Sequence, residues 1–211
     1  MDDHKKIIDM QKSAWASIYA RAADELKIVK WPDEFVVRAS SKWDSGTGIR
    51  TILDLGCGTG RHALFFATVG FEAHGLDFSD KAITIARDQA TLRGVNASFY
   101  CASMLETGFA DNSFDAVVAW RSLHELPYND MPQAIREICR IVKPGGRVLV
   151  AVGGDASTIP SDETRYRFVL SLDKVKELFS CLNVQYIERN IFTYQNRQFM
   201  SEYWILEAIA P

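Results

Sequence analysis

The 211-residue sequence contains no long hydrophobic run. A membrane-spanning helix needs roughly 20 consecutive apolar residues, and no segment approaches that length. The first ten residues, MDDHKKIIDM, also lack the apolar centre of a secretion signal. We therefore expect a cytoplasmic protein with no membrane partner.

Cysteine is scarce and scattered. The four cysteines, Cys57, Cys101, Cys139 and Cys181, lie far apart and form no CxxC pair. Disulfide frameworks and structural zinc sites both depend on closely spaced cysteines, so neither is expected. We predict reduced thiols and assign no metal ligand.

Positive charge is not in excess. The chain has 24 Lys and Arg against 27 Asp and Glu, a net charge of −3, and its isoelectric point is about 5.8. Such a balance provides no positive field for a phosphate backbone, so no nucleic-acid partner is expected. Internal repeats and Pro/Ser-rich linkers are also missing. Because one hydrophobic core can serve a chain of this length, we expect a single domain over residues 1–211, as a monomer or homodimer.

The pattern that is present, from residue 51 onward, alternates strands with helices. Apolar strand-like runs are followed by segments with helical spacing, one capped by Ser79 and ended by Gly94. The predicted strands are 51–55, 71–77, 97–101, 114–120 and 147–152, with helices at 61–70, 80–93 and about 130–142. Alternation of this kind predicts right-handed crossovers and a mainly parallel sheet covered on both faces.

The two ends of the chain add to this pattern. Helical spacing predicts a helix over residues 5–26 and a short one from Pro32 to about Ser40, followed by a loop at 42–48. Near the C-terminus, a helix capped by Ser171 precedes strand-like runs at 184–193 and 197–209, joined only by YQN. So short a link requires an antiparallel hairpin. The fold expected is a doubly wound, Rossmann-like α/β sheet of seven strands.

The turn after the first strand, ILDLGCGTGR (52–61), has glycines at alternate positions: Gly56, Gly58 and Gly60. Glycine permits positive φ and lets a ligand touch the backbone, although a tight turn without a ligand is the alternative reading. Ligands of such sheets bind beyond the carboxyl ends of the strands. The dinucleotide pattern GxGxxG would place a third glycine where Arg61 stands, which argues against a nicotinamide dehydrogenase.

LDLGCGTGR resembles motif I of the class I S-adenosylmethionine-dependent methyltransferases. GLDFS, NSFDAVVAW and IREICRIVKPGGRVLV follow in the order typical of that family. The resemblance covers residues 49–152, and more weakly the final strand. It implies S-adenosylmethionine as cofactor, a core at 49–152, an N-terminal helical lid at 1–45 and a substrate-side helix and hairpin at 153–211.

The resemblance also implies roles for the residues around the glycine loop. Asp54 would receive the cofactor's ammonium, or else only order the loop. Arg61 would reach the cofactor's carboxylate, or else pair with an acidic neighbour on its own helix. Asp77 would bind the ribose hydroxyls, with helix capping beside Ser79 as the alternative. The loop itself, Gly56, Cys57, Gly58 and Gly60, would lie against the methionine and ribose.

Further residues are assigned to the adenine and the sulfonium. Phe78 would lie on the adenine unless it is core, and the Met104 N–H would meet an adenine nitrogen. Ser103 departs from the family, which usually has Asp at this place, so the contact to the adenine amino group would be weaker. The backbone near Trp120 would lie beside the sulfonium.

The acceptor side carries less information. The lid would include Trp15 and Tyr19, unless their helix only packs on the sheet. Arg121 is expected on the substrate side of the site. His124 is the candidate base, but LHEL resembles a family pattern in which the histidine generally packs, so no catalytic residue is assigned. The long polar connection 153–168 is expected to be functional or mobile. The function expected is direct in-line methyl transfer to a small molecule. The alternative is a non-catalytic sensor or partner subunit that binds S-adenosylmethionine or S-adenosylhomocysteine.

Overall fold

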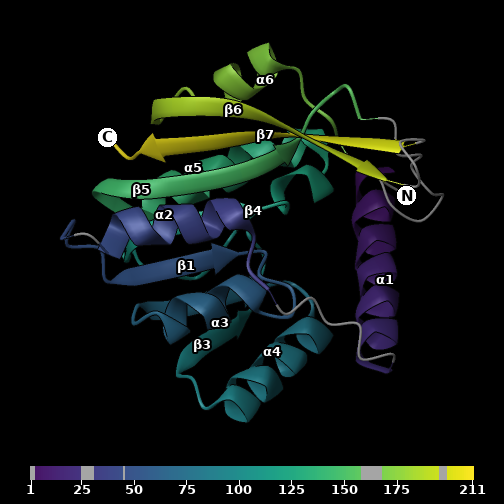
Figure 1. The fold of residues 1–211 in the computed structure, drawn as a ribbon. Coiled ribbons are helices and arrows are strands. Elements are labelled where there is room, and N and C mark those ends of the chain that lie inside the picture. Colours follow the sequence, from purple (N-terminus) through teal and green to yellow (C-terminus); the bar gives the residue numbers. More distant parts are fainter. Residues whose placement is uncertain (1–2, 25–30, 45, 158–167, 195–198) are drawn as a thin grey trace.

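The computed structural model is a seven-stranded sheet with helices on both faces (Figure 1). It describes residues 3–24, 31–44, 46–157, 168–194 and 199–211. The strand order is β3-β2-β1-β4-β5-β7-β6. This order and the layers confirm the doubly wound, Rossmann-like α/β fold expected from the sequence.

The parallel part of the sheet consists of five strands. β1 lies at its centre and pairs with β2 on one side and β4 on the other, so the chain order reverses between β1 and β4. The strands are β1 (Thr51–Leu55), β2 (Glu72–Asp77), β3 (Ala97–Cys101), β4 (Phe114–Trp120) and β5 (Val142–Gly153). Their carboxyl ends meet at one edge, which is where a ligand site is expected.

The C-terminal part of the sheet is antiparallel. β7 (Phe199–Ile209) lies between β5 and β6 (Asn183–Tyr194) and runs antiparallel to both. The predicted hairpin is confirmed, while most of its short link lies at 195–198, outside the described residues.

The helices divide between the two faces of the sheet. α2 (Glu34–Asp44), α3 (Arg61–Thr68) and α4 (Asp80–Arg93) pack on one face, in clusters that include Phe35, Phe66 and Ile83. α5 (Met131–Ile141) and α6 (Leu172–Leu178) pack on the other, around Ile138 and Phe179. Both faces of the central strands are therefore buried, which explains their nearly continuous apolar sequences.

Local chemistry explains where several helices start and stop. The Ser79 hydroxyl accepts from the N–H of Ala82 at the start of α4, and Gly94 ends that helix in the left-handed conformation with φ 64°. The Ser171 hydroxyl caps α6 in the same way by accepting from the N–H of Lys174. These predicted caps are confirmed.

Some boundaries differ from the predictions. α2 continues to Asp44, past the predicted end at Ser40, because Trp43 is buried against Phe66. β5 begins at Val142 rather than 147, since the KPGG segment stays in the strand with a register shift beside β4. Two short 3₁₀ helices, η1 (Leu123–Glu125) and η2 (Tyr128–Asp130), follow β4 without a periodic signal in the sequence.

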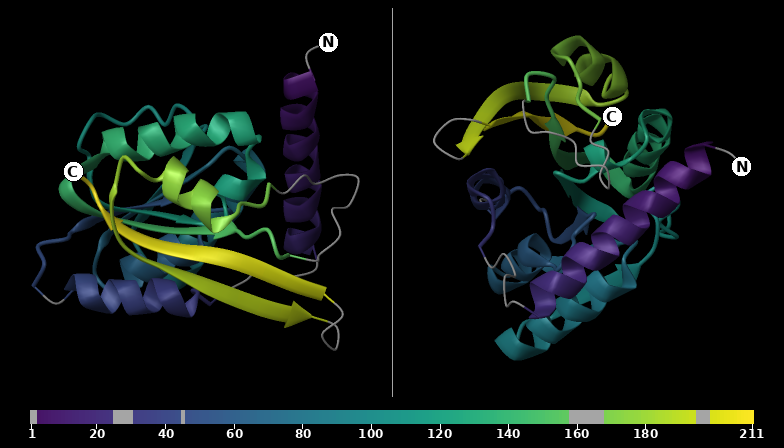
Figure 2. Two further views of the ribbon diagram at one scale, coloured as in Figure 1. Left: turned by 90° about the horizontal axis from the view of Figure 1, so that it is seen from above. Right: turned by 90° about the vertical axis from the view of Figure 1, so that its right-hand side faces the viewer.

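The first helix, α1 (Asp3–Asp24), packs on neither face. It stands across the end of the sheet at the carboxyl ends of the parallel strands, and it contacts α4 (Figure 2). Its predicted end, up to Leu26, lies outside the described residues, as does most of the polar connection at 158–167. No helix in the described part of the chain has the length and apolar character needed to cross a membrane.

Candidate functional site

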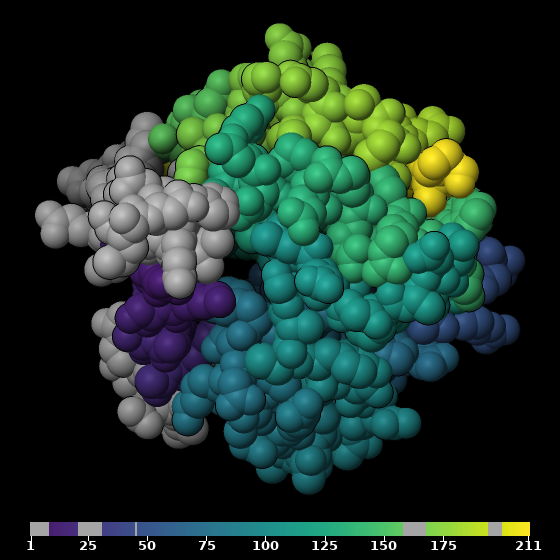
Figure 3. All heavy atoms as spheres, turned by 180° about the vertical axis from the view of Figure 1, so that it is seen from behind, coloured from purple at the N-terminus to yellow at the C-terminus, as the bar shows by residue number. Residues whose placement is uncertain are grey.

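A cavity of about 410 Å³ lies between the carboxyl ends of β1 to β4 and the helix α1. In the space-filling view, α1 in purple lies against the blue-green part of the chain (Figure 3). The cavity is lined from α1 by Gln11, Lys12, Trp15 and Tyr19; from the first three strands and their exits by Gly56, Leu76, Asp77, Phe78, Cys101, Ala102, Ser103, Met104 and Leu105; and after β4 by Arg121, Ser122, Glu125, Leu126, Pro127 and Asp130. It therefore occupies the place where the strand order reverses.

The glycine loop has the conformation that its sequence predicts. Gly56, Gly58 and Gly60 have φ values of 75°, 54° and 84°, a region that side chains other than glycine rarely adopt. A Cβ atom at Gly56 would lie 2.4 Å from Cβ of Ser122, and one at Gly60 would lie 2.9 Å from the Phe99 ring. Two of the three glycines are thus required by the protein's own packing, whatever ligand the loop binds.

Gly58 differs from the other two. A Cβ atom there would lie 3.0 Å from the hydroxyl of Tyr19, which belongs to α1. Since Tyr19 lines the cavity, the loop comes closest to the cavity's covering helix at this glycine. The predicted lid residues Trp15 and Tyr19 both line the cavity and stack on each other, with ring centroids 5.3 Å apart.

Asp77 links the glycine loop to the end of β2. Its Oδ2 accepts from the Gly58 N–H at 2.8 Å, and its Oδ1 accepts from the Ser79 N–H at 2.9 Å. The N–H groups of Gly56 and Cys57 both donate to the Leu76 carbonyl. Burial raises the pKa of the Asp77 carboxyl, although the two N–H donors oppose that shift. One carboxylate thus orders the loop and lines the cavity.

A second carboxylate lies beneath the loop. Asp54 is 1% exposed, and His62 Nδ1 lies 3.8 Å from its Oδ1. His62 Nε2 accepts from the Asp33 N–H, so the ring proton is on the nitrogen that faces Asp54. Oδ2 of Asp54 is buried and accepts no hydrogen bond. A buried acceptor without a donor costs free energy, so this oxygen is suited to receive a donor from a ligand.

Arg61 begins α3 next to this group. Burial lowers the pKa of the Arg61 guanidinium, and the nearby Arg121 cation lowers it further. The Asp54 carboxylate opposes this shift. Arg61 does not line the cavity, and neither does Asp54. The alternative prediction that Arg61 pairs with an acidic residue on its own helix is wrong, because α3 contains no Asp or Glu. The contacts of Asp54 and Arg61 with a cofactor stay a prediction.

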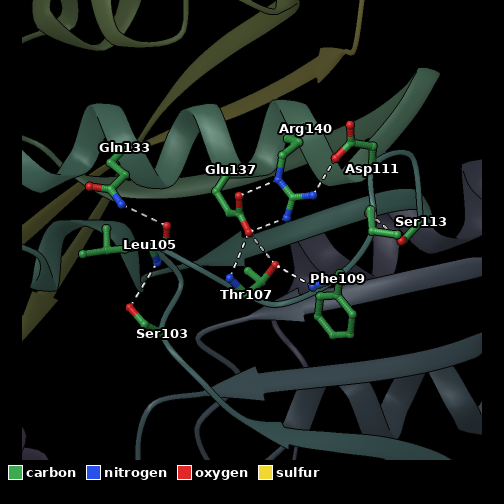
Figure 4. Close-up of polar contacts among 10 residues, drawn as sticks. Ser103, Leu105, Thr107, Phe109, Asp111, Ser113, Gln133, Glu137 and Arg140 are labelled. Carbon is green, nitrogen blue, oxygen red and sulfur yellow. Dashed lines mark hydrogen bonds and ion pairs between the residues drawn. The ribbon is translucent and has the colours of Figure 1, made fainter.

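The wall beyond β3 is a loop held by α5 (Figure 4). Glu137 accepts from the backbone N–H and the hydroxyl of Thr107, and Arg140 donates to both Glu137 and Asp111. These charge-assisted bonds lower the pKa of Glu137 to about 2, and the hydrogen bond from Arg140 is the largest cause. The loop that carries the cavity residues Ser103 and Met104 is therefore tied to α5, whose apolar face is buried against the sheet.

Ser103, for which the sequence predicts a weakened contact to the adenine, has a local partner. Its hydroxyl accepts from the Leu105 N–H at 3.1 Å, an arrangement in which the side chain shapes its own turn. It remains exposed and lines the cavity together with Phe78 and Met104. The three predicted adenine-side residues are thus brought together at one wall.

Three predicted residues point away from the cavity. Cys57 is buried among the side chains of α3, α4 and β3, and burial raises the pKa of its thiol. Trp120 packs on Phe35 and His62, on the face covered by α2. His124 is 3% exposed, packs edge-on against Tyr203 and does not line the cavity. This position gives His124 no direct access to a ligand in the cavity.

Several lining residues were not predicted. Gln11, Trp15 and Tyr19 follow the i, i+4 spacing of one helix face, so periodicity was a usable signal for Gln11. Ser122, Glu125 and Asp130 gave no such signal, because the 3₁₀ turns after β4 have no sequence period. Among the residues described, His, Cys, Asp and Glu side chains do not gather in threes where a metal ion would bind.

Comparison with known proteins identifies the central part of the chain. Residues 52–146 match a family described as a methyltransferase domain. The 27-O-demethylrifamycin SV methyltransferase of Amycolatopsis mediterranei is 36% identical over 113 residues, which cover 52% of this chain and 40% of that protein. The demethylmenaquinone methyltransferase of Listeria monocytogenes is 34% identical over 124 residues, covering 57% and 49%. The chain thus spans about half the length of these curated relatives.

Solved structures agree on the fold. TehB from Haemophilus influenzae superposes with a TM-score of 0.72 at 19% identity, covering 85% of this chain and 63% of that one. A SAM-dependent methyltransferase from Methanosarcina mazei gives a TM-score of 0.68 at 21% identity, covering 75% and 91%. Residues 52–146 thus match a methyltransferase domain, and the sheet has the strand order of the Rossmann-like methyltransferase fold. A domain of this family implies S-adenosylmethionine as methyl donor.

Proposed function

We propose that this protein transfers a methyl group from S-adenosylmethionine to a small-molecule acceptor by direct in-line displacement. The observation that carries the proposal is the cavity at the point where the strand order reverses, lined by both Gly56 and Asp77. Ligands of open α/β sheets bind at such a point. The covering helix α1 makes this cavity suited to hold a small molecule apart from bulk water.

The residues present fit the cofactor. Asp77 lines the cavity and would hold the ribose hydroxyls beside the glycine loop. Asp54 lies outside the cavity lining, so its unpaired Oδ2 would interact with the ammonium through a bridging water. Phe78, Ser103 and Met104 would enclose the adenine. Arg61 would face the carboxylate, and the loop of Gly56, Cys57, Gly58 and Gly60 and the strand end at Trp120 would contribute backbone rather than side chains.

The cofactor, when bound, supplies a methyl group that is already activated on a sulfonium sulfur. The chain's own contribution is then to hold the acceptor close to that carbon, in line with the bond that breaks. A dedicated catalytic residue is not required for this, and His124 is too buried to act directly on a ligand in the cavity. We therefore propose catalysis by positioning.

The acceptor is proposed to be a small molecule because the relatives named above act on such compounds, judging by their names. In this proposal residues 1–45 cover the site, 49–152 bind the cofactor, and 153–211 form the acceptor side. Cytoplasmic location and a monomeric or homodimeric state stay predictions.

A non-catalytic role is the alternative, because the fold alone does not specify methyl transfer. The [4+2]-cyclase SpnF superposes on this chain with a TM-score of 0.66 at 24% identity, so a protein of another activity shares the fold. A sensor or partner subunit would also need the cofactor cavity. The two proposals therefore differ in turnover and agree in binding.

The test is to measure binding and turnover separately. S-adenosylhomocysteine is titrated into the purified protein, and S-adenosylmethionine is then incubated with the protein and a small-metabolite extract while S-adenosylhomocysteine formation is followed by mass spectrometry. If the protein is a methyltransferase, it should bind S-adenosylhomocysteine, and it should form S-adenosylhomocysteine from S-adenosylmethionine only when the extract is present. Binding without product supports the non-catalytic alternative, and absence of binding contradicts both.

A further inference from the structure

Arg121 has an unusual backbone conformation for its residue type. Its φ is 57°, in the left-handed region, and among the described non-glycine residues only Asn112 shares this feature. Such a conformation costs about 1–3 kcal/mol and persists only when the surroundings hold it. Here the Arg121 N–H donates to the Ala151 carbonyl, and the next hydroxyl, Ser122, donates to the Leu55 carbonyl at 2.8 Å. Strain of this kind is often found at functional sites.

The guanidinium is held by two aromatic rings. Its carbon lies 4.7 Å from the ring centroid of Phe192 on β6 and 4.3 Å from that of Tyr203 on β7. Cation–π contacts of this kind fix a guanidinium without using its N–H donors. The C-terminal hairpin therefore positions a cation at the wall of the cavity.

The residues that the structure describes give this cation no counter-charge. Nε of Arg121 is buried without a hydrogen-bond partner, and in the ranges that the structure describes no carboxylate lies within ion-pair distance of the guanidinium. Burying a donor without an acceptor costs free energy, so a ligand with an acceptor would be favoured here. Arg121 lines the cavity, so a ligand bound there lies next to this residue.

We propose that Arg121 determines acceptor specificity by binding an anionic group, most simply a carboxylate, on an acceptor with an apolar body. The neighbouring lining residues Trp15, Leu126 and Pro127 would contact that body. Glu125 and Asp130 bring negative charge to the same cavity, so the proposal concerns one anionic group at Arg121 and not a polyanion. The inference rests on the proposed function, since it assumes that the cavity holds an acceptor as well as the cofactor.

The experiment uses a matched pair of probes, benzoate and benzamide, which differ in charge but hardly in shape. Each is titrated by ligand-observed NMR into protein saturated with S-adenosylhomocysteine. We expect the wild type to bind benzoate at least tenfold more tightly than benzamide. Arg121→Gln should reduce that preference to less than twofold, Arg121→Lys should keep part of it, and Arg93→Gln, at an exposed site on α4, should keep all of it.

Affinity for S-adenosylhomocysteine is the second readout, and it should change less than threefold in Arg121→Gln. The proposal is overturned if the wild type shows no preference or binds neither probe, or if Arg121→Gln keeps the preference. A tenfold loss of S-adenosylhomocysteine affinity in Arg121→Gln would instead assign the cation to the cofactor's carboxylate. If Arg121→Gln does not fold, the proposal is tested by the wild type's preference for benzoate over benzamide and by how much of that preference Arg121→Lys keeps. Failure of the proposed function itself would appear separately, as wild type that does not bind S-adenosylhomocysteine.

Discussion

The glycines of the loop are needed for two different reasons, packing against neighbouring side chains and contact with the cavity side of the loop. Gly56 and Gly60 are required by neighbouring side chains, whereas Gly58 faces α1 and donates to Asp77. A sequence motif that resembles a ligand-binding signature is therefore also a packing motif, and substitutions can separate the two contributions.

Gly56→Ala should destabilise the protein by roughly 3 kcal/mol, since a methyl group adds a clash with Ser122 to the cost of positive φ. Gly48→Ala is the matched control, because Gly48 also has positive φ, at 80°, but nothing lies within 4 Å of its added Cβ. That control should cost only about 1 kcal/mol. Urea unfolding measures both, and equal losses would contradict the packing explanation.

Asp77→Asn should weaken S-adenosylhomocysteine binding at least tenfold, because charge-assisted hydrogen bonds are worth about 1.5–3 kcal/mol each. The raised pKa of Asp77 means that its ionised form is disfavoured by folding, so its stabilising contribution falls as pH rises through that pKa. Removing the charge should therefore lower stability at pH 7 much less than it lowers affinity. Isothermal titration and urea unfolding measure the two effects. The exposed neighbour Asp80→Asn should change neither, and an unchanged affinity in Asp77→Asn would refute the ribose assignment.

Among the elements, the loop between β3 and β4 depends most on a contact distant in sequence. It has no helix or strand of its own from residue 107 to 113, and the Glu137–Arg140 pair on α5 holds it (Figure 4). Because Ser103 and Met104 precede this anchor in the same loop, α5 contributes to the cavity without touching it.

Glu137→Gln should lower the free energy of unfolding by about 1–2 kcal/mol at pH 7, since Thr107 and Arg140 lose a charged acceptor. The pKa of Glu137 is lowered from 4.5 to about 2, so its stabilising effect is present above pH 4.5 and disappears as pH falls toward 2. Urea unfolding at pH 7 and pH 3 should show the difference between wild type and variant shrinking. Glu177→Gln, which loses only an exposed pair with Lys174, is the control and should cost less than about 0.5 kcal/mol.

For the whole molecule, the cavity joins segments that are far apart in sequence. α1, the exits of β1 to β3 and the turns after β4 all line it, and Arg121 in its wall is held by β6 and β7. A ligand that binds there contacts much of the folded chain at once and should stabilise the native state as a whole.

S-adenosylhomocysteine at 100 times its dissociation constant should raise the free energy of unfolding by about 2.7 kcal/mol, because it binds only the folded state. NAD at the same concentration should have no effect, since the loop lacks the third dinucleotide glycine at position 61. Thermal and urea unfolding with each compound make the comparison. Stabilisation by NAD rather than S-adenosylhomocysteine would contradict the assignment of the cofactor.

Local signals predicted much of this structure. The bounds of β1, β3 and β4 agree residue by residue with the apolar runs, and the caps Ser79, Gly94 and Ser171 act through backbone groups within a few positions. The start of β5 was wrong because pairing with β4 overrides the turn preference of KPGG. The 3₁₀ turns after β4 escaped prediction because segments of three residues have no period to detect.

By itself the sequence determined the order and type of the elements, the glycine loop and the family resemblance, because each depends on periodicity or on neighbours along the chain. Only the tertiary structure decided which side chains reach the cavity. It turned Cys57 and Trp120 away, buried His124, brought Phe192 and Tyr203 onto Arg121 and placed α1 over the strand ends. The physical reason is that these contacts join residues tens of positions apart, and their geometry exists only once both faces of the sheet are packed.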